Sequence, residues 1–184
     1  MSKCPFKNMK MSKIRSHIGL AVLAFSLGLL TTSCNSKAEH RPSPPASDSV
    51  QVNGVSINVE YSSPGVKKRK IWGELVPYNE IWRTGANKAT FLNTSGDILI
   101  NGETLPKGTY AIFTIPTDST WTIIFNEEWD QWGSYNYNQN KDIFRLIVTP
   151  SKSDFDERMK FTLTKNALTF DWEELSYELT IDTP

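Results

Sequence analysis

Cysteine and histidine are scarce in this chain of 184 residues, which holds two of each. Cys4, Cys34, His17 and His40 all precede residue 50, so residues 50–184 contain neither a thiol nor an imidazole. That part of the chain therefore cannot form a Ser-His-Asp or Cys-His catalytic arrangement. The zinc, copper and non-haem iron sites that need imidazole or thiolate ligands are excluded there as well. We expect no metal and no cofactor.

A strong charge of either sign is also missing, because 20 Lys and Arg balance 20 Asp and Glu. Five of the basic residues and none of the acidic ones lie in residues 1–33, which leaves 15 bases against 20 acids in the remainder. A mildly acidic domain is a poor candidate for binding nucleic acid, whose phosphates attract basic surfaces. We therefore expect no nucleic-acid partner.

The chain has one marked apolar run, Ile18–Leu30, and it is shorter than the about 20 residues that a helix needs to cross a membrane. Basic residues precede this run, and the small residues Thr31–Ser33 follow it. This order is typical of a secretory signal, which is removed from the mature protein. We interpret residues 1–33 as a signal peptide.

Cys34 comes directly after this segment, and its position resembles the lipobox of bacterial lipoproteins, whose cysteine receives a diacylglycerol. The sequence departs from that pattern at Thr31, where the family prefers Leu. Two or three acyl chains, at about 0.8 kcal/mol per buried methylene, would anchor the protein firmly. Plain secretion with a free thiol is the alternative. Residues 34–49 are rich in Pro and Ser, and we interpret them as an extended tether.

Residues 50–184 carry the pattern of a β domain. Apolar and polar residues alternate in three segments, 55–61, 159–164 and 175–181. Three more segments are apolar on both faces, 110–115, 121–125 and 143–148. Alternation indicates strands with one buried face, and continuous apolar runs indicate central strands between two layers.

Two Asn-Gly pairs mark tight turns, because type I′ hairpins need a positive φ at both central residues. They are Asn53-Gly54 and Asn101-Gly102. No segment has a long helical period, although 77–82 and 127–132 are predicted to form a turn or two of helix. The expected fold is all-β, a single antiparallel β-sandwich of jelly-roll or immunoglobulin-like type, with a closed barrel as the second choice.

The segment 71–90 is the first candidate for a binding site. It combines tryptophans, acidic residues, a cation and an amide: Trp72, Trp82, Glu74, Glu80, Arg83 and Asn87. Arg83 and Asn87 have the donors to bind a carboxylate, a phosphate or a sugar. The structural alternative places the two tryptophans over the core and pairs Arg83 with Glu74 or Glu80, and we favour it for the tryptophans.

The segment 127–140 is the second candidate. Four rings alternate with amides and acids there, and the ligand-binding candidates are Trp129, Asp130, Trp132 and Tyr135. Such a loop suits a sugar, because rings stack on the C–H faces of pyranoses while amides and carboxylates bind the hydroxyl groups. The structural alternative is a long connection anchored by its own aromatic side chains.

Two charged sets carry weaker signals. A glycosidase needs a facing pair of carboxyl groups, and candidates are Glu74, Glu80, Glu127, Glu128 and Asp130. Nothing in the sequence fixes the separation of any two of them. The basic run Lys67–Lys70 has the charge to meet an anionic surface or partner, whereas a solvated turn is the usual role of such a run.

Three motifs are specific in combination: Trp82–Asn87, Leu105–Tyr110 and Asp130–Gly133. Through them, and over most of residues 52–164, the chain resembles the family called domain of unknown function 2911, mostly envelope proteins of Bacteroidetes and related bacteria. The resemblance implies a single β domain in an exported protein. It implies no activity and supplies no catalytic residue.

We therefore expect a lipid-anchored protein of the cell envelope, on the periplasmic or surface side of the outer membrane. The hypothesis is a non-catalytic binding module for a glycan or another polar ligand, with the membrane and a glycan or an envelope protein as partners. The alternatives are a carboxylate-based carbohydrate hydrolase and a structural component of an outer-membrane assembly.

Overall fold

The computed structural model of the chain describes residues 41–184. Within this range the chain forms ten strands and one short 3₁₀ helix, Gln139–Lys141. The strands are β1 (Pro45–Val52), β2 (Val55–Ser62), β3 (Thr90–Thr94), β4 (Ile98–Ile100), β5 (Glu103–Leu105), β6 (Gly108–Pro116), β7 (Trp121–Asn126), β8 (Asp142–Val148), β9 (Ser151–Leu163) and β10 (Ala167–Asp182).

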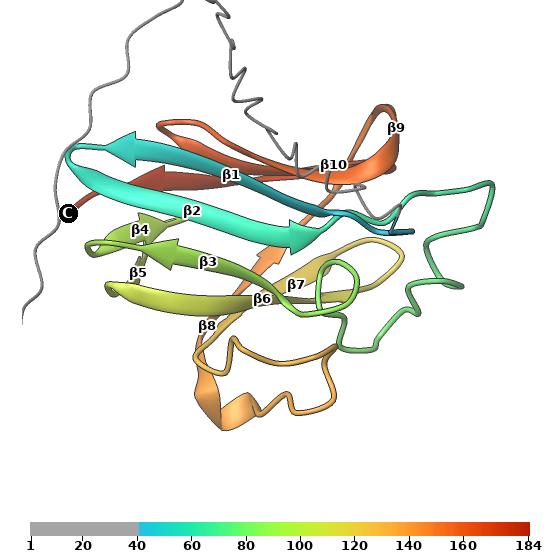
Figure 1. Ribbon diagram of the computed structural model, residues 1–184, viewed down its shortest axis with the longest axis horizontal. Coiled ribbons are helices and arrows are strands. Elements are labelled where there is room, and N and C mark those ends of the chain that lie inside the picture. Colours follow the sequence, from blue (N-terminus) through green and yellow to red (C-terminus); the bar gives the residue numbers. More distant parts are fainter. Residues whose placement is uncertain (1–40) are drawn as a thin grey trace, which may run out of the picture. The chain divides into compact units, whose positions relative to one another are not determined.

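The strands form two antiparallel sheets, one of six strands in the order β1-β2-β3-β6-β7-β8 and one of four in the order β5-β4-β10-β9. Figure 1 shows the two sheets as separate layers, with the long strands β9 and β10 behind β1 and β2. The all-β sandwich is confirmed. The sheets do not join into the closed barrel that was the second choice.

The core fills the space between the two sheets. Ile57, Val59 and Leu92 of the larger sheet are fully buried, and so are Leu168, Phe170 and Leu179 of the smaller one. A cluster of tryptophan rings closes one part of this core: ring centroids lie 4.4 Å apart for Trp72 and Trp121 and 5.8 Å apart for Trp82 and Trp172. Trp72 and Trp82 are each 8% exposed, which agrees with the structural role favoured for them.

The two Asn-Gly turns are confirmed, whereas the prediction of helical turns in 77–82 and 127–132 is wrong. Asn53-Gly54 and Asn101-Gly102 all have positive φ and close the β1–β2 and β4–β5 hairpins. Residues 77–82 do not coil, because Trp82 N donates to Thr114 O of β6 at 2.8 Å. In 127–132 the Gln131 carbonyl accepts from Ala89 N at 3.0 Å. Both segments bond to distant parts of the chain, and the backbone bonds within 127–132, from Trp129 N to Glu127 O and from Gln131 N to Trp129 O, span two residues and are not helical.

The folded domain begins earlier than the sequence predicts. Strand β1 starts at Pro45, so residues 45–49 belong to the sheet and not to the tether assigned to 34–49. β1 is an edge strand whose side chains alternate between exposed and half-buried. Such a strand needs backbone pairing and few large apolar residues, which explains why its polar composition resembles a linker. Asp48 adds a link to the other sheet by accepting from Leu163 N at 2.7 Å.

A second, smaller apolar cluster lies on the opposite face of the six-stranded sheet. Ala111, Phe113 and Ile124 of β6 and β7 are buried there with Ala89, and Tyr137 packs against them. The layer that covers this face consists of loops and not of strands. These are the β2–β3 connection, which Figure 1 shows in green, and the β7–β8 connection, which it shows in orange. This explains why β6 and β7 are apolar on both faces.

Candidate functional site

The two segments singled out in the sequence lie side by side. Gly133 N donates to Asn87 O at 2.9 Å, and Ala89 N donates to Gln131 O at 3.0 Å. Lys88 and Trp132 form a β-bridge within this short pairing. The residues Asn87–Ala89 and 131–133 thus form a small ribbon over the outer face of the six-stranded sheet.

Side-chain contacts fix this ribbon as well. Lys88 Nζ lies 2.6 Å from Asp130 Oδ1 in an exposed ion pair. Gly133 has a φ of +67°, and a Cβ at this position would lie 2.9 Å from the Tyr135 ring. Only glycine adopts such a backbone conformation without cost, so Gly133 sets the turn that presents Trp132 and Tyr135.

The aromatic residues of the β7–β8 loop have two different roles. Trp129 packs on Phe91 of β3 with ring centroids 5.1 Å apart, and Tyr137 packs edge-on against Phe113 of β6 at 5.1 Å. These two rings anchor the loop to the sheet. Trp132 is 61% exposed and Tyr135 is 85% exposed, so their rings point outward.

A polar network fixes the base of the same loop. Tyr137 Oη donates to Asp142 Oδ2 at 2.8 Å and accepts from Arg145 Nη2 at 2.7 Å. Asn126 Nδ2 donates to Asp142 Oδ1 at 2.7 Å and to Asn138 O at 2.9 Å. Burial, together with the bond to Asp142, raises the pKa of Tyr137 to about 12. The phenol therefore stays protonated at neutral pH and remains a donor.

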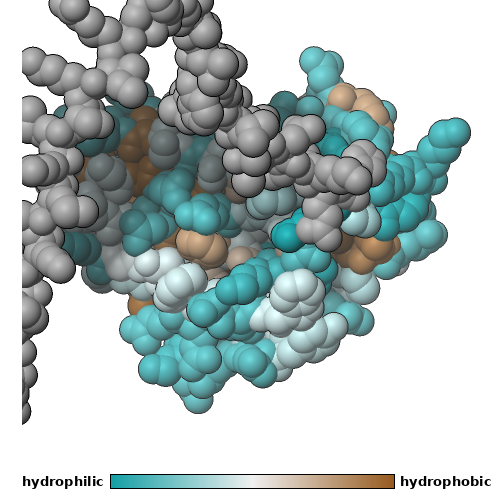
Figure 2. Space-filling view, viewed as in Figure 1, coloured by the Kyte–Doolittle hydropathy of each residue, from teal (hydrophilic) through white to brown (hydrophobic). Residues whose placement is uncertain are grey.

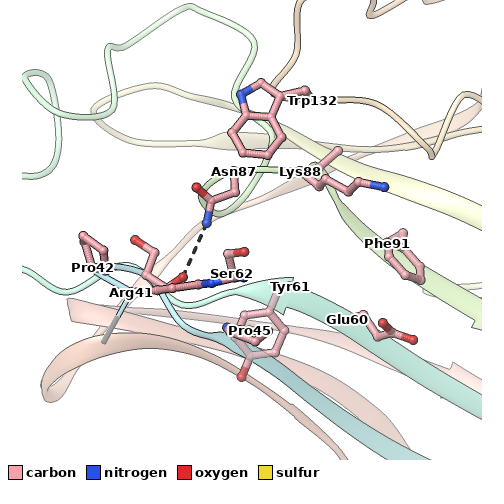
Figure 3. Close-up of a pocket in the computed structure, with 12 residues that line it drawn as sticks. Arg41, Pro42, Pro45, Glu60, Tyr61, Ser62, Asn87, Lys88, Phe91 and Trp132 are labelled. Carbon is pink, nitrogen blue, oxygen red and sulfur yellow. Dashed lines mark hydrogen bonds between the residues drawn. The ribbon is translucent and has the colours of Figure 1, made fainter. Parts of the chain in front are cut away.

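A groove of about 610 Å³ runs between this ribbon and the N-terminal part of the sandwich. Its lining residues are Arg41, Pro42, Ser43, Pro45, Glu60, Tyr61, Ser62, Asn87, Lys88, Ala89, Phe91 and Trp132. Figure 3 shows Trp132 and Asn87 on one side and the β2 residues Glu60, Tyr61 and Ser62 on the other. Sites for small ligands commonly have volumes of about 300–1,000 Å³, and this groove falls within that range.

The groove combines rings with polar groups of both signs. Asn87 Nδ2 donates to Ser43 O at 3.4 Å, a bond drawn in Figure 3 that joins the two walls. Tyr61 Oη accepts from Phe161 N at 3.1 Å, and burial raises the pKa of this tyrosine. Its hydroxyl is thus engaged in the fold. Figure 2 shows the β7–β8 loop below as mainly hydrophilic, with paler patches of intermediate hydropathy.

The structure separates the predicted ligand-binding residues into three sets. Asn87 and Trp132 line the groove directly. Trp129 and Asp130 contact lining residues, namely Phe91 and Lys88. Arg83 and Tyr135 are not among the lining residues. Cys34, the predicted lipidation site, lies outside the described residues.

Several residues that line the groove were not predicted from the sequence. Glu60 and Phe91 face each other as cross-strand partners of β2 and β3. The alternation over 55–61 does place Glu60 on the outer face, but it gives no hint of the strand register. Arg41 belongs to the segment interpreted as a tether, so no signal in the sequence connects it to a site.

Carboxylate pairs for hydrolysis are not assembled in the groove. Among its lining residues Glu60 is the one carboxylate. Of the predicted acids, Glu74 pairs with Lys70 at 3.2 Å and Glu127 pairs with Lys141 at 3.3 Å. A glycosidase of the usual kind needs two carboxyl groups on either side of the scissile bond. The groove geometry therefore supports binding and gives no support to the hydrolase alternative.

Residues 41–184 contain no cluster of three or more His, Cys, Asp or Glu side chains that is arranged to hold a metal ion. In the same range, no helix has both the length and the apolar character needed to cross a membrane.

Three comparisons with known proteins bear on identity. No curated protein matches the chain, and no solved structure matches it. A family model does match: the family described as "Protein of unknown function (DUF2911)" aligns with residues 43–181, which include all ten strands except the last residue of β10. This is the family that the sequence motifs resemble. The matched region begins two residues before β1. The chain belongs to the DUF2911 family.

Proposed function

We propose that the groove between the Asn87–Trp132 ribbon and strand β2 binds a glycan, and that the protein is a non-catalytic binding module. The observation that carries this proposal is Trp132. Its ring is 61% exposed and lines the groove, on a ribbon that backbone hydrogen bonds and an ion pair hold in place. A large exposed ring on a fixed support is available to a ligand without rearrangement of the fold.

The chemistry of the lining matches a sugar better than an apolar ligand. Trp132, Phe91 and Tyr61 offer ring faces, against which the C–H faces of a pyranose can pack. Between the rings, Asn87 supplies an amide and Glu60 a carboxylate. These groups donate to and accept from hydroxyl groups in a directional way. A glycan presents both apolar C–H faces and polar hydroxyl groups.

The proposal includes export and a lipid anchor at Cys34. Fully extended, the chain between Cys34 and Arg41 spans at most ~25 Å, because each residue adds about 3.6 Å. Since Arg41 lines the groove, an anchored protein would hold its groove within this distance of the membrane surface. Such a position suits a ligand that belongs to the cell envelope.

Binding is tested by titrating a soluble form of the mature chain that lacks Cys34, residues 35–184, with a panel of cell-wall and plant oligosaccharides while tryptophan fluorescence is recorded. We expect a saturable change with at least one oligosaccharide. Trp132→Ala should weaken that binding by about tenfold or more, as is typical when an aromatic side chain at a binding hot spot is truncated. Tyr135→Ala is the matched control, because it removes an exposed ring from the same loop but not from the groove.

Two results would overturn the glycan proposal. One is the absence of any saturable change over the whole panel. The other is equal affinity of the Trp132→Ala and Tyr135→Ala variants, which would place the ligand elsewhere.

Anchoring is tested separately by metabolic labelling of the full chain with a tagged fatty acid. We expect label on the wild-type protein and none on Cys34→Ala. Cys4→Ala is the control, since it removes the other cysteine and should leave the label in place. A wild-type protein that stays unlabelled would show that the chain is not lipidated, and it would leave the groove proposal untouched.

A further inference from the structure

A second, smaller cavity of about 160 Å³ lies beneath the first part of the β2–β3 connection. It shares no lining residue with the groove and has about a quarter of its volume. The lining residues are Pro64, Arg69, Leu75, Val76, Trp82, Arg83, Gly85, Ala86 and Trp172. We call it the arginine pocket. It brings Arg83, a candidate from the sequence, together with Arg69 of the basic run Lys67–Lys70.

The arginine pocket has buried hydrogen-bond donors that lack an acceptor. Arg83 Nε and Trp172 Nε1 are both shielded from solvent, and neither has a hydrogen-bond partner in the described part of the chain. The neighbouring Trp82 Nε1 does have one, the carbonyl of Gly85 at 3.1 Å. A buried donor without an acceptor costs about 1–3 kcal/mol, so such groups are rare and call for an explanation. Two of them belong to side chains of this one pocket.

The positive charge in the pocket has no counter-ion from the described residues that line it, since none of these is acidic. The sequence suggested Glu74 or Glu80 as the partner of Arg83, and of these Glu74 is paired with Lys70 while Glu80 is not among the lining residues. Glu173, close to Trp172 in the chain, accepts from Trp72 Nε1 at 3.2 Å and from Glu174 N at 2.9 Å. Glu74 and Glu173 are therefore engaged elsewhere.

Arg69 is held in place by the fold. Its guanidinium donates to Gly65 O and to Val66 O, which fixes it against its own turn. Burial lowers the pKa of the Arg83 guanidinium, and the nearby Tyr135 opposes this shift. Arg83 is half-buried, and even partial burial of a cation without a partner is unfavourable, so an anion in the pocket would relieve that cost.

We infer that the arginine pocket binds the carboxylate of a small organic acid. A guanidinium matches a carboxylate through two parallel hydrogen bonds, and a carboxylate offers only acceptors to a pocket that has surplus donors. The remaining walls are apolar, from Leu75, Val76 and the tryptophan rings, so they suit a short apolar body behind the carboxylate. The volume excludes a sugar chain. This inference does not depend on the proposed function of the groove.

The test uses sodium propionate and follows the indole N–H signals of the ¹⁵N-labelled mature chain by NMR at constant ionic strength. We expect a saturable shift of the Trp172 signal. Propionamide has the same shape without the charge, and it should bind about tenfold more weakly or not at all. Equal binding of the two compounds, or no saturable shift with propionate, would overturn the inference.

Variants locate the site. Arg83→Gln should weaken propionate binding by about tenfold or more, and Arg83→Lys, which keeps the charge but loses the planar fork, should weaken it less. Lys107→Gln is the matched control, because it removes the same charge from an exposed position in the β5–β6 turn. If Arg83→Gln fails to fold, Arg83→Lys still decides the question, since unchanged affinity in that variant would contradict bidentate binding.

Two further results would count against the inference. Tighter binding of inorganic phosphate than of propionate would show that the pocket takes a different class of anion. Loss of propionate binding in Trp132→Ala would place the acid in the groove, whereas the inference expects that variant to bind propionate as the wild type does.

Discussion

The six tryptophans of this chain occupy two environments that differ in burial and in neighbours. Trp72, Trp82, Trp121 and Trp172 lie in the core and pack on one another or on neighbouring rings. Trp129 and Trp132 lie on the β7–β8 loop, and the exposed fraction of Trp132 reaches 61%. The same residue type fills the core in the first region, whereas in the second Trp129 anchors the loop on Phe91 and Trp132 presents an exposed ring. Burial, not residue type, separates the two roles.

The core tryptophans and Trp132 also differ in what holds them in place. The core tryptophans are held by other side chains, so each loss of a ring leaves a cavity. Trp132 is held through its backbone, which pairs with Lys88, so we expect its side chain to be dispensable for the fold. Substitutions in the two regions should therefore separate stability from binding.

The largest effect is expected inside the core, from Trp121→Ala. This ring lies within 5.8 Å of the rings of Trp72, Phe170 and Tyr177 and is almost fully buried. Its truncation should lower the free energy of unfolding by about 3–5 kcal/mol. Urea denaturation measures this value. Trp129→Ala, which removes a half-exposed ring from Phe91, should cost about 1 kcal/mol, and equal losses would erase the contrast between the regions.

A smaller effect is expected from Gly133→Ala in the loop. The positive φ of this residue and the close approach of the Tyr135 ring both oppose a Cβ. We expect a loss of about 1–2 kcal/mol in the free energy of unfolding and weaker ligand binding in the groove, because the ribbon that carries Trp132 must shift. Gly102→Ala is a useful control: it has a similar positive φ but an open surrounding, so it should reduce stability without affecting the groove.

Alkaline pH should lower the stability of the fold through Tyr137 of the β7–β8 loop. The folded protein raises the pKa of Tyr137 to about 12 from the ordinary value of 10.0. The unfolded chain therefore releases this proton at a lower pH than the folded chain, and stability present below pH 10 is lost as the pH rises toward 12. Tyr137→Phe removes this titration. Its unfolding midpoint, measured between about pH 9 and about pH 11, should fall less steeply than that of the wild type, and an unchanged slope would contradict the assignment.

The smallest effect on stability is expected from Trp132→Ala. An exposed side chain contributes little to folding, so the free energy of unfolding should change by less than about 0.5 kcal/mol. The same variant should lose ligand binding in the groove. A loss of stability comparable to that of Trp129→Ala would show that the Trp132 ring supports the fold.

Much of the fold could be predicted because one property, alternation, is local. The polar and apolar positions of 55–61 and 175–181 set the two faces of β2 and β10 without reference to any other segment. Asn-Gly pairs fix their turns for the same reason. Strand β1 was not predicted, because its own side chains are mostly polar and its pairing with β2 depends on both segments.

The site was harder to predict because it depends on contacts distant in the sequence. The ring and amide content of 127–140 left open whether its rings face a ligand or anchor the loop, and the structure shows both, since Trp132 faces outward while Trp129 and Tyr137 pack on the sheet. The groove also needs Glu60 from β2 and Arg41 near the N-terminal edge, and only the sheet register brings these residues to the ribbon. Arg83 lies close to Asn87 in the sequence, yet it lines a different cavity. Proximity along the chain is a poor guide where the backbone turns sharply.

The most direct test of the central proposal is to map a bound oligosaccharide by NMR on the backbone amides of the mature chain. The ligand used is the one that gives the largest fluorescence change in the panel. We predict that the shifted signals cluster at residues 60–62, 87–89, 91 and 132, which line the groove. Signals that shift instead on the outer surface of the β9–β10 sheet, for example around Phe155, would contradict the proposal.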